Sequence, residues 1–145
     1  MPSRLIIITV FLLAISGCRV RNEPNRSIGP NKVIEIKYPQ NKQLIQKVPL
    51  QKSTTESLHA IRVKDREKPH YHDNHSLRVV VTAGCGYIHF RNKKFRIKPG
   101  DQILIPPKTL HWAQSLCNKP LEVIAAFSPP FDGKDIRAAQ ESGGQ

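Results

Sequence analysis

The chain has 145 residues, enough for one folded domain with its own hydrophobic core but short for two. It carries 23 Lys and Arg residues against 11 Asp and Glu residues, a formal net charge of +12 at pH 7. Such an excess of positive charge is compatible with binding to nucleic acid or to an anionic lipid or cell-wall surface, and also with a basic surface that is merely solvated. The export signal described next argues against nucleic acid, so we expect no nucleic-acid partner.

The first 17 residues are predicted to be a signal peptide. Arg4 supplies a positive charge, and residues 5–15 form an apolar run broken only by Thr9. The run is shorter than the roughly 20 apolar residues that a membrane-spanning helix needs. The segment Ile15-Ser16-Gly17-Cys18 resembles a bacterial lipoprotein box, and this resemblance implies cleavage before Cys18 and lipid attachment to it. We therefore expect an exported protein, lipid-anchored to a membrane of the bacterial cell envelope. The alternative is an ordinary signal peptide followed by a chance cysteine.

Residues 18–52 are predicted to form a flexible tether that leads into a first strand. The segment is rich in Asn, Lys, Pro and Gln and poor in aromatic residues, a composition that disfavours a packed core. Residues 33–36 are the candidate strand, and residues 44–45 and 48–50 are weaker apolar patches. At the other end, residues 132–145 form a polar tail, which we expect to fray.

Residues 53–131 have the pattern of short β-strands separated by turns. Runs of β-branched and aromatic residues alternate with turn residues, as in Gly84-Cys85-Gly86 and Pro99-Gly100-Asp101. No stretch after residue 17 has sustained helical periodicity. The pattern predicts an all-β sandwich or barrel. The predicted strands cover residues 58–63, 76–82, 87–90, 95–97, 102–105, 110–116 and 121–127. The barrel interior is predicted to be lined by Val79, Val81, Ile103, Ile105 and Ile124, or by their strand neighbours.

A histidine pattern in this region predicts a metal site. His70 and His72 are two residues apart, so on a β-strand their side chains share one face. His111 follows the Pro99-Gly100-Asp101 turn and lies on a later predicted strand. Three neutral imidazoles that converge on one ion leave a coordination position open for a ligand.

Several motifs in this order resemble those of a small, single-domain cupin of the type-2 kind. Pro69-His70-Tyr71-His72, then Gly84-Cys85-Gly86 and Pro99-Gly100-Asp101, then Ile105-Pro106 and His111 carry the resemblance, over roughly residues 54–131. It implies an all-β jelly-roll barrel over residues 53–131, with a metal held by the three histidines.

The chain departs from the cupin pattern at the fourth ligand. Many cupins place a Glu four residues after the second histidine, and here that position is Ser76. The resemblance therefore implies the three-histidine variant, with Ser76 as a weak candidate ligand. His75 is a further candidate, although its parity places it on the face opposite His70 and His72. We expect a divalent transition metal as cofactor, and Fe, Mn, Zn, Ni and Cu all suit imidazole ligands.

Two cysteines remain besides Cys18. In a cupin-like jelly roll, the turns that carry Cys85 and Cys117 lie at the same end of paired strands, so the resemblance allows a disulfide between them. Two unpaired cysteines are the alternative. Residues 127–135 resemble a tail that wraps the barrel in some small cupins.

Cupins support many functions, so the fold alone does not assign one. The first hypothesis is an envelope-anchored module that binds a metal and a small ligand. The second is a metal-dependent oxygenase or isomerase, and the third is a barrel whose metal site is a relic. The sequence does not decide whether the protein is an enzyme, because no Asp or Glu lies clearly at an inward position. By analogy with other cupins, we expect a homodimer.

Overall fold

The computed structural model describes residues 35–139, and every regular element in this range is a β-strand. This confirms the predicted all-β fold class. No helix within residues 35–139 is long and apolar enough to span a membrane. In chain order the strands are β1 (Ile45–Lys52), β2 (Ser57–Val63), β3 (His70–Tyr71), β4 (Ser76–Ala83), β5 (Gly86–Phe90), β6 (Lys93–Ile97), β7 (Gln102–Ile105), β8 (His111–Ser115), β9 (Leu121–Ser128) and β10 (Arg137–Ala138).

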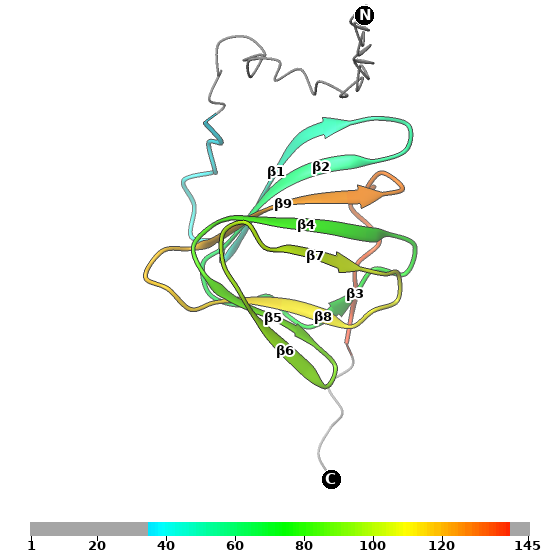
Figure 1. The fold of residues 1–145 in the computed structure, drawn as a ribbon. Helices are drawn as coiled ribbons and strands as arrows, with labels where there is room; N and C mark the ends of the chain where they lie inside the picture. The colour runs from blue at the N-terminus through cyan, green and yellow to red at the C-terminus, as the bar shows by residue number, and fades with distance from the viewer. Residues whose placement is uncertain (1–34, 140–145) are drawn as a thin grey trace, which may run out of the picture. The chain divides into compact units, whose positions relative to one another are not determined.

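The strands form two antiparallel sheets that face each other (Figure 1). One sheet has the order β1-β2-β9-β4-β7, and the other has the order β10-β3-β8-β5-β6. The chain passes repeatedly between the two sheets, and the β4–β5 and β8–β9 connections are two of these crossings. This is the double-sheet jelly-roll arrangement that the turn pattern predicted.

Side-chain alternation on the central strands builds the core between the sheets. In β9, Leu121, Val123, Ala125 and Phe127 are buried, whereas the residues between them are more exposed. Successive strand residues point to opposite faces, so this parity fixes the inner face of the sheet. Ile124, which was predicted to line the interior, therefore lies on the other face, and its neighbours line the interior instead. Of the remaining predicted lining residues, Val81 and Ile105 belong to the buried core cluster, and Val79 and Ile103 are partly buried and pack against it.

The first strand lies later in the chain than predicted. Residues 35–36 of the candidate strand 33–36 are not in a strand, and residues 33–34 lie outside the described range. Instead β1 occupies a segment with only scattered apolar residues, and it pairs with β2 in a register that places Ile45 opposite Val63. The register shifts between Pro49 and Gln51, where proline lacks the N–H that a regular ladder needs.

The structure describes part of the predicted C-terminal tail but none of the predicted signal peptide. The predicted signal peptide, Cys18 and the tether up to residue 34 lie outside the described residues, as do residues 140–145. The predicted fraying is wrong for the described part of the tail. Residues 137–138 form β10 and pair with Tyr71 and His70 of β3, because the tail finds backbone partners at an open sheet edge.

A disulfide joins two of the connections that cross between the sheets. Cys85 lies between β4 and β5, Cys117 lies between β8 and β9, and their Cα atoms are 5.5 Å apart. The glycines beside Cys85 allow this close approach. A Cβ atom on Gly86 would lie 2.2 Å from the backbone oxygen of Gln114, and Gly84 has a φ of +72°.

Candidate metal centre

The three histidines of the predicted site converge at one end of the barrel. His70 lies on β3, His72 follows the end of that strand, and His111 begins β8, where it pairs directly with His70. One ligand nitrogen from each ring lies within 4.8 Å of the others. The ring centroids are 4.5 Å apart for His70 and His111, 5.1 Å for His70 and His72, and 5.5 Å for His72 and His111.

Hydrogen bonds to backbone carbonyls fix the orientation of all three rings. The Nδ1 atom of His70 lies 2.9 Å from the Lys68 carbonyl oxygen, that of His72 lies 2.5 Å from the Asp135 oxygen, and that of His111 lies 2.8 Å from the Thr109 oxygen. A carbonyl oxygen can only accept, so each Nδ1 must carry the hydrogen and donate it. Each Nε2 is then left with a free lone pair, which is the state that a metal ligand requires.

Burial keeps two of these imidazoles in the neutral form. His72 and His111 are each 3% exposed. Burial lowers the pKa of both to about 4, although the hydrogen bonds to Asp135 and Thr109 act in the opposite direction. Because a histidine binds a metal only when neutral, both side chains are in a ligating state at neutral pH.

His75 lies beside His72 but belongs to a different network. Its Nδ1 atom hydrogen-bonds the Asp135 carboxylate, and its Nε2 atom lies 3.3 Å from the carbonyl oxygen of Pro130. His72, His75 and Asp135 form a second group with donor atoms within 4.8 Å of one another. Both nitrogens of His75 already have protein partners, so we interpret this group as a hydrogen-bond network that supports His72.

Asp135 anchors the C-terminal tail to the segment that carries His72. Its carboxylate accepts hydrogen bonds from His75, from the backbone N–H groups of Asp73 and Asn74, and from the Asn74 side chain. Burial raises the pKa of Asp135, but the bonds from His75, Asn74 and Asp73 outweigh it and lower the pKa to about 2. No local pattern predicts this role, since Asp135 lies 63 residues from His72.

Ser76 takes no part in the cluster. Its hydroxyl lies 3.4 Å from the Ser128 carbonyl oxygen, to which it donates, and its side chain does not line the cavity beside the histidines. The three imidazoles therefore form the cluster without a carboxylate. Such a nitrogen donor set fits a divalent transition metal with at least one position left for another ligand.

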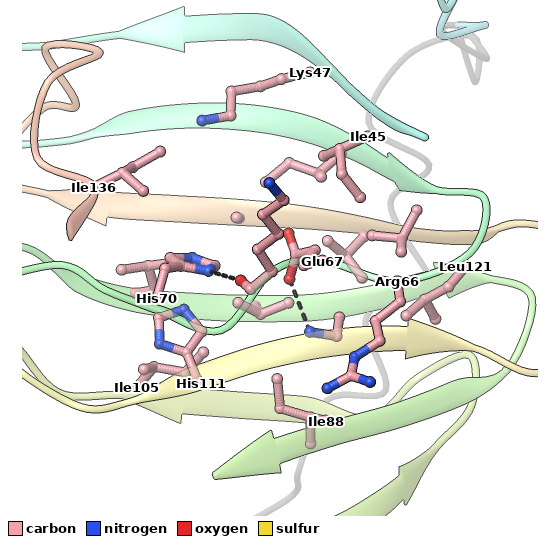
Figure 2. A pocket seen from close by; sticks show the side chains of 18 of the residues that line it. Ile45, Lys47, Arg66, Glu67, His70, Ile88, Ile105, His111, Leu121 and Ile136 are labelled. Atoms are coloured by element: carbon pink, nitrogen blue, oxygen red, sulfur yellow. Dashed lines mark hydrogen bonds between the residues drawn. The ribbon is translucent and has the colours of Figure 1, made fainter. Parts of the chain in front are cut away.

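A cavity of about 710 Å³ extends from the histidines into the barrel. Most of its wall is apolar, and apart from the histidines its polar lining residues are Gln43, Lys47, Arg66, Glu67 and Lys68. Figure 2 labels Lys47, Arg66 and Glu67 among the side chains of this wall. Glu67 accepts a hydrogen bond from the Ala113 backbone N–H at 2.8 Å. Sequence reasoning missed Lys47, because that residue lies in the segment interpreted as a tether.

The other two histidines of the described chain do not join the cluster. His59 hydrogen-bonds the Ser57 hydroxyl at 3.0 Å and packs edge-on against Phe127. His89 stacks on Trp112 with a centroid distance of 4.7 Å and lies 3.2 Å from the Gln114 side chain. Both contacts are those of packed structural residues.

Comparison with known proteins identifies relatives of this chain. Residues 56–124 match a family described as an AraC-like ligand binding domain. An uncharacterised protein from Aquifex aeolicus is 32% identical over 91 residues, which cover 63% of this chain and 74% of the relative.

Solved structures share the fold at lower sequence identity. KdgF from a Halomonas species has a TM-score of 0.60 at 24% identity, covering 67% of this chain and 89% of KdgF. An uncharacterised protein with a double-stranded β-helix domain from Klebsiella pneumoniae has a TM-score of 0.60 at 16% identity, covering 71% and 90%. At these identities the likeness concerns the fold alone.

Proposed function

Because this chain contains a cupin domain and belongs to the same family as the Aquifex aeolicus protein, we propose that its barrel binds one divalent transition-metal ion and a small ligand beside it. His70, His72 and His111 would hold the ion through their Nε2 atoms. The match to a family of ligand-binding domains supports a binding role for the cavity.

The observation that carries this proposal is the shared hydrogen-bond pattern of the three histidines. Three separate backbone carbonyls accept from the three Nδ1 atoms. Histidines packed only for stability do not need a nitrogen of each ring to lie within 4.8 Å of a nitrogen of each other ring. Converging, unprotonated nitrogens repel one another electrostatically unless a cation or a hydrogen-bond donor lies between them.

Metal analysis tests the proposal directly. We expect the purified wild-type protein, stripped and then titrated with Co²⁺ or Zn²⁺, to bind about one equivalent, because one ion saturates three converging ligands. A His70→Ala, His72→Ala double variant should lose this binding, whereas a His89→Ala control should retain it. Equal metal content in the wild type and the double variant would contradict the proposal.

A binding role fits the cavity better than the alternative of an oxygenase or isomerase. Acid–base catalysis needs a positioned proton donor or acceptor near the bound molecule. Among residues 35–139, Glu67 is the one carboxylate that lines the cavity, and it already accepts a hydrogen bond from Ala113. The described residues therefore favour binding.

We also propose that Cys18 carries a lipid that anchors the domain to a membrane of the cell envelope. The support comes from the sequence: an apolar run of signal-peptide length ends at small residues directly before Cys18. Wild-type protein expressed in bacteria should incorporate labelled palmitate and fractionate with membranes, whereas a Cys18→Ser variant should do neither. Equal labelling of the two proteins would contradict this.

A further inference from the structure

The cavity contains a lysine whose charge has no ion-pair partner within residues 35–139. Lys47 lies on β1 opposite Ile61 and lines the cavity. None of the ion pairs among the described residues includes it. Burial lowers its pKa, while the charge of Glu67 raises it. A partly desolvated ammonium of this kind is stabilised when an anionic group enters beside it.

Lys47 lies close to the candidate metal centre. Its ammonium is 4.0 Å from the ring centroid of Phe131 and 5.4 Å from that of Phe127. The same two rings lie 5.9 and 5.4 Å from the ring of His72. Figure 2 shows the Lys47 side chain extending toward the end of the cavity that His70 and His111 occupy. A small molecule bound there would have both the histidine cluster and Lys47 within reach.

The charges at this end of the cavity select for an anion. A divalent ion on three neutral imidazoles keeps its full charge, and Lys47 adds another positive charge. Two nearby carboxylates, Glu67 and Asp135, offset only part of these charges: Glu67 acts on Lys47, and Asp135 is hydrogen-bonded to His75, so a divalent ion together with Lys47 still leaves an excess of positive charge. A negatively charged group of the ligand would therefore be stabilised both by the metal ion and by Lys47.

The rest of the cavity selects for an apolar body. Its wall away from the histidines is formed mainly by aliphatic side chains from both sheets, among them Ile61, Val79, Ile88, Ile103 and Val123. Apolar ligand surface that leaves water for such a wall contributes favourably to binding, whereas polar groups placed there would lose hydrogen bonds to water.

We propose that the ligand is a small carboxylic acid with an apolar body, and that Lys47 is the residue that recognises its carboxylate. The inference rests on the proposed function, because the histidine cluster with its metal forms the other half of the carboxylate site. In this arrangement the carboxylate faces the histidines and accepts a charge-assisted hydrogen bond from the Lys47 ammonium, while the hydrocarbon part extends along the aliphatic wall.

Titration of the full chain loaded with Co²⁺ tests the inference. The probes are hexanoate, acetate, which lacks the apolar body, and hexan-1-ol, which lacks the carboxylate. Calorimetry measures affinity, and the visible absorption of Co²⁺ reports a new ligand near the ion. We expect wild-type protein to bind hexanoate at least roughly tenfold more tightly than either other probe, and hexanoate to change the spectrum.

Lys47→Met keeps the length and apolar stem of the side chain and removes the charge. We expect hexanoate to bind this variant roughly 10- to 100-fold more weakly, with hexan-1-ol affinity and Co²⁺ stoichiometry unchanged. Lys52→Met is the matched control, because Lys52 is exposed on the same strand and does not line the cavity; its hexanoate affinity should equal that of wild type.

The experiment distinguishes failure of the proposed metal binding from failure of the ligand inference. If wild-type protein does not bind Co²⁺, the proposed function is wrong and the ligand inference falls with it. If Co²⁺ binds but hexanoate binds Lys47→Met as tightly as wild type, or no more tightly than acetate, the ligand inference alone is overturned.

Discussion

His72 and His111 are neutral because they are buried, and this makes the metal-free protein sensitive to acid. Burial lowers the pKa of each from an ordinary 6.5 to about 4. Between those values the unfolded chain binds more protons than the folded one, so the free energy of unfolding rises with pH across this window. We predict that metal-free protein loses stability on acidification from pH 7 to pH 5, as measured by urea unfolding.

The matched variant for this prediction is His72→Gln with His111→Gln, which replaces both imidazoles by neutral amides. Its free energy of unfolding should depend less on pH between 7 and 5 than that of wild type. Asp135 does not contribute to the pH dependence of stability between pH 7 and 5, because its pKa is about 2 in the folded protein. A double variant with the same pH dependence as wild type would show that other groups cause the acid sensitivity.

Asp135 is predicted to stabilise the fold through its charge. Its carboxylate accepts four hydrogen bonds from the segment Asp73–His75, and an amide can accept only part of this set. We expect Asp135→Asn to lower the free energy of unfolding by about 1–3 kcal/mol at pH 7 in urea. Since the pKa of Asp135 is lowered to about 2, this difference should persist above pH 4 and shrink as pH falls toward 2.

Asp132→Asn is the control for this substitution. Asp132 is an exposed neighbour in the same tail, and within residues 35–139 its side chain accepts hydrogen bonds only from the nearby N–H groups of Lys134 and Asp135. Its replacement should change stability by well under about 1 kcal/mol. Equal effects at the two positions would mean that the His75 contact contributes little.

At the scale of elements, the C-terminal tail supports the candidate metal centre. The segment after β9 supplies the carbonyl that accepts from His72, and β10 extends the sheet beside β3. We predict that a chain ending at Phe131 still folds, because β9 ends at Ser128, but binds Zn²⁺ roughly 10- to 100-fold more weakly. Loss of a partner that orients a ligating histidine has an effect of this size.

A chain ending at Ala139 is the matched control, since it keeps β10 and removes only residues outside the described range. Its Zn²⁺ affinity, measured by competition with a chelator, should equal that of the full chain. If the two truncations bind Zn²⁺ equally well, the tail does not position His72.

The same elements show what the sequence could and could not predict. Most of the strands from β2 to β9 and the proximity of His70 to His72 follow from local patterns: β-branched runs, turn residues and a two-residue spacing. The convergence of His111 on these two histidines was implied by the motif order that resembles cupins. β1 does not have such a pattern. It forms because its backbone pairs with β2, and tertiary pairing of this kind overrides weak local preference.

Lys47 and Asp135 were not predicted as site residues for the same reason. Lys47 faces the cavity only because β1 is a strand in a particular register. Asp135 meets His75 and His72 only because the tail turns back over the barrel. Contacts between residues about 60 positions apart leave no periodic trace in a single sequence. The tail was expected to fray from its polar composition, yet its polar groups are the ones that hold it in place.

At the scale of the whole molecule, the disulfide ties together two of the connections between the two sheets, β4–β5 and β8–β9. Cys85 precedes β5 and Cys117 follows β8, and a backbone hydrogen bond of 3.0 Å joins Leu116 to Cys85 at the same point. The cross-link lies in two connections between the sheets. Neither the histidine cluster nor the C-terminal tail contributes a residue to it. It should therefore affect global stability without changing the metal centre.

We predict that Cys85→Ser with Cys117→Ser lowers the free energy of unfolding in urea by about 3–4 kcal/mol, because the cysteines are 32 residues apart and the cross-link restricts the unfolded chain. Wild-type protein unfolded in the presence of a reductant should match the variant. Zn²⁺ stoichiometry should stay at one equivalent in both, since the three histidines lie on other segments. Equal stability of wild type and variant without reductant would contradict the prediction, whereas loss of Zn²⁺ binding in the folded variant would show that the sheet connections and the histidine cluster are coupled.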